Sequence, residues 1–152
     1  MSVGIEADRQ RVWRALVHPD EMVAWNPGRV AALSLPPDYP KPGQTARWRA
    51  RLHGVTMPLV EKPLEVDPAE RMRSELRFSL VRIDQTFAVA SNAEHPETTR
   101  VSLKLVAPNA IPMLGSTLDR FGVRELAQEI VDETLRALRA WCEEGEAPPR
   151  PA

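Results

Sequence analysis

The sequence contains a single cysteine, and this scarcity excludes a disulfide framework. Cys142 has no second thiol in the chain with which to pair. Because it falls near the end of a predicted helix, we expect a packed or half-exposed thiol.

Long apolar runs are also absent. No stretch of about 18 apolar residues occurs, and the N-terminus lacks a basic segment followed by an apolar one. Neither a membrane span nor a signal peptide is therefore indicated, and a cytoplasmic location is the default expectation.

The chain has no excess of charge of one sign. Its 20 basic and 21 acidic residues leave a formal net charge of -1. Nucleic-acid binding usually needs a basic domain with interleaved aromatic side chains, so we expect no nucleic-acid partner. Arginines do alternate along two predicted strands, where long charged side chains usually keep an outer sheet face soluble: Arg47, Arg49, Arg51, Arg71, Arg73 and Arg77.

Motifs for catalysis and metal binding are missing. His18, His53 and His95 lie in separate elements, with no carboxylate or cysteine at ligand spacing, so we expect no metal site. The sequence also has no GxSxG, P-loop, GxGxxG or CxxC motif. No cofactor is expected, and no catalytic residue can be named from a motif.

The composition that is present fits one globular domain. Hydrophobic residues make up 43% of the 152-residue chain and charged residues 27%. We predict a single domain over residues 1–144 and a disordered tail over residues 145–152, which read GEAPPRPA.

The segment Leu114–Glu144 is the longest periodic stretch and predicts a helix of roughly 45 Å. Ser116 is a suitable N-cap, Gly122 allows a kink, and Gly145 followed by prolines ends the helix. Apolar and small residues recur at three- and four-residue spacing and form one stripe: Val123, Leu126, Ala127, Ile130, Thr134, Ala137, Leu138 and Trp141.

Upstream, helical periodicity gives way to alternation. We predict helices over Ala7–Val17 and Pro19–Trp25. Strands are predicted over Ser2–Glu6, Val30–Leu35, Gln44–His53, Thr56–Val66, Arg71–Leu80, Val81–Ala90 and Thr98–Ala107. Because the later links have hairpin length, the fold class is α+β: a seven-stranded curved antiparallel sheet, with two short helices after the first strand, wrapped around the long C-terminal helix.

Three sequence motifs resemble those of a known family. Val12–Glu21, running on to Trp25, is similar to a "VW..L.DP…W" signature, and Pro42-Gly43 and Val60–Pro63 before Asp67-Pro68 also fit. Together they resemble the Bet v 1-like, START-related (SRPBCC) superfamily, in its polyketide cyclase/dehydrase and lipid-transport group. The resemblance implies a helix-grip fold with a cavity between sheet and long helix, where members hold sterols, lipids, polyketides or plant hormones.

The predicted pocket is apolar with two polar points, which suits a small hydrophobic molecule carrying a hydroxyl or carbonyl. Ser74 and Gln85 fall on otherwise apolar strand faces; the alternative is that each bonds to a neighbouring strand or lies at a rim. The predicted ligand-binding residues are Trp48, Met72, Ser74, Phe78, Gln85 and Phe87 from the sheet, and Leu118, Phe121, Ala127 and Ile130 from the helix.

Residues 111–121 do not share the face of the helix stripe. Leu114, Leu118 and Phe121 would lie opposite Val123 and Ile130 on a straight helix. Two explanations remain open: a lid hinged at Gly122, or burial in a homodimer interface.

Three functions follow from the resemblance and the pocket. The first is non-catalytic binding or transport of a small hydrophobic ligand; the second is a polyketide cyclase or aromatase; the third is a co-chaperone-like interaction module. The predicted interior has no titratable group except Glu61, which favours binding over proton-transfer chemistry. A carboxylate deep in the pocket would favour an enzyme instead.

Overall fold

The computed structural model of the chain describes residues 1–107 and 118–145, with side chains in the second range described from residue 124 onward. The elements follow the predicted order. They are β1 (Ser2–Ile5), α1 (Arg9–Val17), α2 (Pro19–Trp25), β2 (Arg29–Ser34), β3 (Ala46–Leu52), β4 (Val55–Asp67), β5 (Arg71–Phe78), β6 (Val81–Ser91), β7 (Thr99–Val106) and α3 (Leu118–Glu144).

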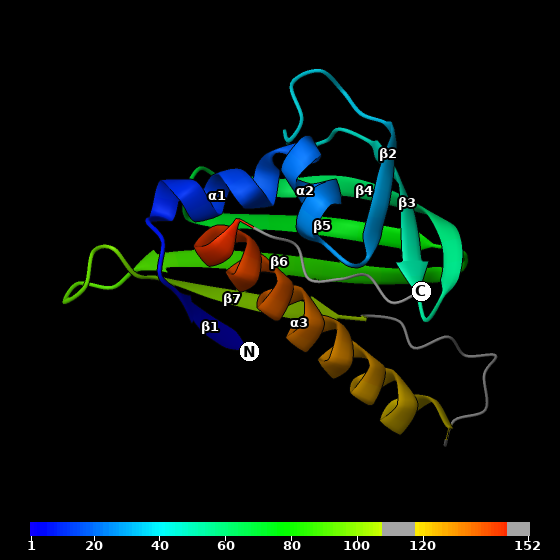
Figure 1. Cartoon of the computed structure of the whole chain (residues 1–152). Coiled ribbons are helices and arrows are strands. Elements are labelled where there is room, and N and C mark those ends of the chain that lie inside the picture. Colours follow the sequence, from blue (N-terminus) through cyan, green and yellow to red (C-terminus); the bar gives the residue numbers. More distant parts are fainter. Residues whose placement is uncertain (108–117, 146–152) are drawn as a thin grey trace.

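The seven strands form one sheet in the order β1-β7-β6-β5-β4-β3-β2. Every neighbouring pair is antiparallel, as the short links predict. Figure 1 shows a curved sheet with all three helices on the same side. The predicted α+β helix-grip fold is therefore confirmed. Among the described residues, no helix combines the length and apolarity that a membrane crossing needs.

The alternation in β3 explains how the sheet separates its two faces. Ala46 and Trp48 are fully buried, whereas Arg47 and Arg49 are exposed on the outer face. The hairpin to β4 turns at His53 and Gly54, which have φ angles of 47° and 76°. Two consecutive positive φ angles match the tight turn that suits the twist of antiparallel strands.

The described core consists of two groups of buried side chains. The larger group joins α1, the C-terminal half of α3 and the strands at the β1 end of the sheet, and includes Ile5, Val12, Leu103 and Leu138. The smaller group lies under α2 on the β3–β5 side: Met22, Ala46, Trp48, Leu59 and Leu76. The sheet is thus covered by different helices at its two ends.

The described part of the long helix runs from Leu118 to Glu144 and continues through Gly122. The proposed cap Ser116 lies outside the described residues. The helix contacts β1, β7, α1 and α2, and its C-terminal half buries Val131 and Leu135 as well as the predicted Thr134, Ala137 and Leu138. The buried face of this half is therefore wider than the stripe predicted from the sequence, because several elements surround it. Nearer its start, Leu126, Ala127 and Ile130 are only half-buried.

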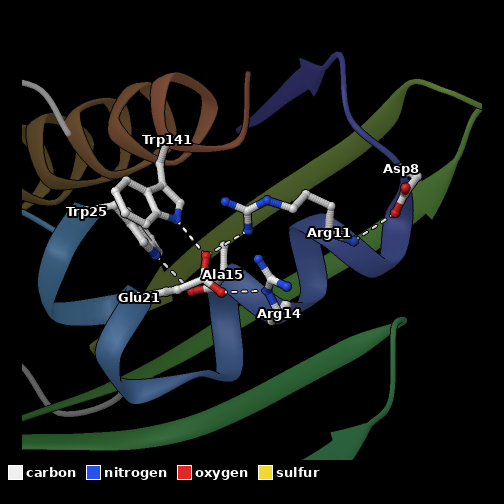
Figure 2. Close-up of polar contacts among 7 residues, drawn as sticks. All are labelled: Asp8, Arg11, Arg14, Ala15, Glu21, Trp25 and Trp141. Atoms are coloured by element: carbon white, nitrogen blue, oxygen red, sulfur yellow. Dashed lines mark hydrogen bonds and ion pairs between the residues drawn. The ribbon is translucent and has the colours of Figure 1, made fainter. Parts of the chain in front are cut away.

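The carboxylate of Glu21 joins α3 to both short helices (Figure 2). Its Oε1 accepts hydrogen bonds from Arg11 Nη1 at 2.7 Å and Trp141 Nε1 at 2.8 Å, and its Oε2 accepts one from Arg14 Nε at 2.8 Å. Burial opposes ionisation, but the hydrogen bonds from Trp141, Arg14 and Arg11 outweigh it and lower the pKa of Glu21. An ionised carboxylate therefore holds the end of α3 at neutral pH.

Replacing Glu21 with glutamine is expected to lower the free energy of unfolding by about 1 kcal/mol at neutral pH, because a partly exposed amide loses both ion pairs. Since the folded-state pKa lies below the ordinary value of 4.5, the carboxylate stabilises the fold above that value, and this contribution is lost as pH falls through the lowered pKa. The free energies of unfolding in urea of wild type and Glu21→Gln should therefore converge as the pH falls below 4.5 and through the lowered pKa. The exposed Glu133→Gln is the control, and a gap that does not change with pH would contradict the assignment.

Candidate functional site

A cluster of polar side chains is buried on the inner face of β2–β5. Arg29 starts β2, and Glu61 and Ser74 point inward from β4 and β5. They are 4%, 0% and 1% exposed, respectively. Such burial is rare for charged side chains unless they are paired, so their partners define the cluster.

Three donors converge on one oxygen of Glu61. Its Oε1 accepts hydrogen bonds from Arg29 Nη1 at 2.9 Å, Tyr39 OH at 2.7 Å and Trp48 Nε1 at 3.0 Å. The Arg29 guanidinium also lies over the Trp48 ring, with Cζ 4.7 Å from the ring centroid, and the Tyr39 ring meets Trp48 edge-on. The loop between β2 and β3 supplies Tyr39, so this loop is tied to the strands by the same carboxylate.

The ion pair determines the protonation states. Burial raises the pKa of Glu61, but the charge and hydrogen bond of Arg29, with the hydroxyls of Tyr39 and Ser74, outweigh it and lower the pKa. Burial alone would lower the pKa of Arg29, but Glu61 raises it. Burial and the Glu61 charge raise the pKa of Tyr39 well above 10.0. At neutral pH Glu61 is therefore ionised, Arg29 is charged and Tyr39 keeps its proton.

Two polar atoms of this cluster have no hydrogen-bond partner. They are Oε2 of Glu61 and Oγ of Ser74, and both are buried. The Ser74 hydroxyl is near enough to favour the ionised carboxylate, although its geometry falls short of a hydrogen bond. The cluster thus has one saturated carboxylate oxygen and one that can still accept.

The structure divides the predicted sheet residues between the two core groups. Met72 and Phe87 pack with α1 and α3. Trp48 and Phe78 belong to the group under α2. Ser74 is paired directly with Gln85 across β5 and β6. Trp48, Met72, Ser74 and Phe87 are buried, whereas Phe78 and Gln85 are half-buried and therefore lie nearer to solvent.

On the helix, the predicted residues Ala127 and Ile130 are half-buried. The side chains of Leu118 and Phe121 lie outside the described residues, as does most of the segment 111–121 proposed as a lid or interface. Ligand binding by the ten predicted residues stays a prediction.

Sequence reasoning missed Arg29 and Tyr39. Arg29 fell just before the predicted second strand, and Tyr39 falls within a proline-rich loop. The available signal was Glu61, which lies between Leu59 and Pro63 on the inward side of β4, where both neighbours are buried. A carboxylate at an inward position requires a buried cation, but the sequence does not show which arginine supplies it.

The outer face of the same strands carries an open depression of about 660 Å³. Its lining includes Pro58 and Val60 together with the basic residues Arg47, Lys62 and Arg77. Arg77 is already paired with Glu75. The depression lies on the opposite face from Glu61. We place the candidate site at the buried cluster because, in the described part of the chain, its convergent polar groups meet an apolar interior.

A family model described as "Polyketide cyclase / dehydrase and lipid transport" matches residues 1–143. No curated protein matches the chain. Among solved structures, a START superfamily protein from Mycobacterium smegmatis is similar at 16% identity and a TM-score of 0.73, with 92% of each chain covered. TTHA0849 from Thermus thermophilus is similar at 26% identity and a TM-score of 0.67, with 93% of this chain and 94% of that chain covered.

DynU16, a protein of the dynemicin biosynthetic locus, is similar at 19% identity and a TM-score of 0.66. The match covers 96% of this chain and 47% of DynU16, so this chain spans about half of that protein's length.

Proposed function

Since the chain belongs to the polyketide cyclase / dehydrase and lipid transport family, we propose that it binds a small, largely apolar molecule between the inner face of the sheet and α3, and that it does so without catalysing a reaction. The family and the fold support a ligand-binding or cyclase-like role. The choice between these two roles rests on the chemistry of the buried cluster and on the apolar surface beside it.

The observation that carries the proposal is a set of apolar side chains left half-buried on two elements. On α3 these are Leu126, Ala127 and Ile130. They continue the stripe that is buried further along the helix at Thr134, Ala137 and Leu138. On the inner face of β5 and β6 they are Phe78 and Ile83.

The contacts that α3 makes with the sheet support a position of Leu126–Ile130 over its inner face. The helix packs on β1 and β7, and Glu129 Oε2 lies 3.8 Å from His53 Nε2 in the β3–β4 turn. The helix therefore crosses from one end of the sheet to the other. Apolar surface that a domain leaves incompletely buried on facing elements is typical of a ligand site.

The state of Glu61 supports binding over proton transfer. A buried carboxylate does lie at the inner end of this surface, which by position alone would favour an enzyme. However, a general acid or base works best with a pKa near the operating pH, and the pKa of Glu61 is lowered from 4.5 by Arg29. Such a carboxylate is a weak base and has no proton to donate at neutral pH.

A polyketide cyclase is the second candidate, and the Tyr39–Glu61 hydrogen bond of 2.7 Å is the observation that favours it. Because Tyr39 donates its one proton to Glu61, its phenol oxygen is left to accept a hydrogen bond, and it can orient the enol hydroxyl of a poly-β-ketone. Conversion of a poly-β-ketone that is lost in Tyr39→Phe would establish this role and exclude pure binding.

Replacing Ala127 with tryptophan is expected to weaken binding of a hydrophobic probe, because the large ring would occupy the space between α3 and the sheet. With anilinonaphthalene sulfonate as the probe, we expect Kd to rise by about 10-fold or more, which corresponds to about 1.4 kcal/mol. The measurement is a fluorescence titration, accompanied by native mass spectrometry of protein purified from its own host.

The matched control is Gln128→Trp, which adds the same ring at the neighbouring exposed position of α3. Equal Kd values for Ala127→Trp, Gln128→Trp and wild type would remove the binding site from this location.

A further inference from the structure

We propose that the ligand is anchored by a hydroxyl group, which donates its proton to Oε2 of Glu61 and accepts a hydrogen bond from the Ser74 hydroxyl. The natural ligands would then be alcohols rather than ketones or carboxylic acids. This inference rests on the proposed binding function and specifies the chemical class of its ligand.

The two carboxylate oxygens of Glu61 differ in their hydrogen bonding. Oε1 of Glu61 already has three donors, at 2.7 to 3.0 Å, and Oε2 has none. Leaving a buried acceptor unpaired costs about 1–3 kcal/mol, and more for a charged group. The other buried side-chain atoms without a partner in the described part of the chain belong to Arg51, Arg82 and Asp84.

Those three residues share the register of the outer sheet face, since Arg51 alternates with exposed Arg49, and Arg82 and Asp84 pair with Arg77 and Glu75. The unsatisfied inner pair is therefore confined to Glu61 and Ser74 among the described side chains. Two unpaired atoms at one place, facing the core, call for a single partner that can satisfy both.

The chemistry of the two atoms selects that partner. An ionised carboxylate oxygen only accepts hydrogen bonds, whereas a serine hydroxyl both donates and accepts. A ligand hydroxyl can donate to Oε2 and accept from Oγ at the same time. A ketone has no proton to donate to Oε2, and a carboxylate would place a second negative charge beside Glu61. An ammonium group would be repelled by Arg29, whose guanidinium is held 2.9 Å from the same carboxylate.

The position of Ser74 connects the pair to the apolar surface. Ser74 is directly opposite Gln85 on β6, and the next inward pair along these strands is Leu76 with Ile83. Directly opposed residues in antiparallel strands lie about 5 Å apart at Cβ. Because Gln85 and Ile83 are half-buried while Ser74 is 1% exposed, the polar pair lies at the inner end of the surface that Phe78, Ile83 and α3 provide.

The test compares decanol, the methyl ketone of equal chain length, and decanoate, each displacing anilinonaphthalene sulfonate from the full chain. Wild type is expected to bind decanol at least about 10-fold more tightly than the ketone or decanoate, the factor expected for a hydrogen bond to a charged group. In Ser74→Ala the preference for decanol should fall several-fold. That substitution removes an unpaired hydroxyl, so the fold should be retained. Ser102→Ala, on β7, is the matched control and should keep the wild-type preference.

The variant Glu61→Gln should shift the ligand preference from the alcohol toward the ketone. In Glu61→Gln the side-chain amide can donate a hydrogen bond, so the ketone should gain affinity relative to decanol. Equal affinity of wild type for decanol and ketone, or an unchanged preference in Ser74→Ala, would overturn the hydroxyl anchor while leaving the binding function in place. Failure of anilinonaphthalene sulfonate and all three ten-carbon probes to bind would overturn both.

Discussion

Replacing Arg29 with methionine is expected to lower the free energy of unfolding by about 3–5 kcal/mol, because it leaves the ionised Glu61 buried without its cation. Arg29 is 4% exposed and Glu61 0%, so water cannot solvate the remaining charge. For a domain of this size the loss corresponds to a fall in Tm of about 6–20 °C. Thermal and urea unfolding followed by circular dichroism would measure it.

Two controls isolate the ion pair. Arg49→Met removes an exposed arginine from the outer face of β3 and should change stability by less than about 0.5 kcal/mol. The double variant Arg29→Met with Glu61→Leu should recover much of the loss, since an apolar pair often replaces a buried ion pair without net cost. A loss below about 1 kcal/mol in Arg29→Met alone would contradict a buried, ionised Glu61.

The variant Arg29→Met should reverse the pH dependence of the contribution that Glu61 makes to stability. In wild type the folded-state pKa of Glu61 is lowered from 4.5, so its contribution is present above that value and is lost as pH falls through the lowered pKa. Without Arg29, burial raises the pKa of Glu61 in the folded state. The destabilisation of Arg29→Met should therefore shrink as pH falls and Glu61 takes up a proton.

Replacing Leu138 with alanine is the second large effect, with an expected loss of about 2–5 kcal/mol. Leu138 is 0% exposed and belongs to the core group that joins α3 to α1 and the β1 end of the sheet. Removing its side chain leaves a cavity where the helix is held most tightly. Urea unfolding gives the loss directly.

Leu126→Ala on the same helix is the matched control, because Leu126 is only half-buried. We expect it to cost about 1 kcal/mol or less while weakening binding of the hydrophobic probe. Equal losses for the two variants would mean that α3 is packed along its whole described length, and the proposed site beside Leu126 would then have no room for a ligand.

The elements of the fold could be predicted because each depends on local periodicity. The alternating Ala46, Arg47, Trp48 and Arg49 already separate an inner from an outer sheet face, and the short links allow only antiparallel neighbours. The predicted start of the long helix at Leu114 lies outside the described residues, so it stays a prediction.

The candidate site was predictable in part. Ser74 and Gln85 stood out because they are polar residues at inward positions, and their direct pairing follows from the register of β5 and β6. Arg29 and Tyr39 could not be connected with Glu61 from the sequence, because they are 32 and 22 residues away from it. Only the curvature of the sheet and the path of the β2–β3 loop bring them together.

The amino-acid sequence alone therefore specifies the order and type of the elements, the two faces of each strand and membership of the fold class, since periodicity, turn residues and charge act over a few neighbouring positions. Packing in three dimensions selects which arginine neutralises Glu61, which carboxylate oxygen stays free and which half of α3 is tightly packed. Those outcomes depend on where distant elements meet, because the energy of a buried charge is set by the atoms around it in space.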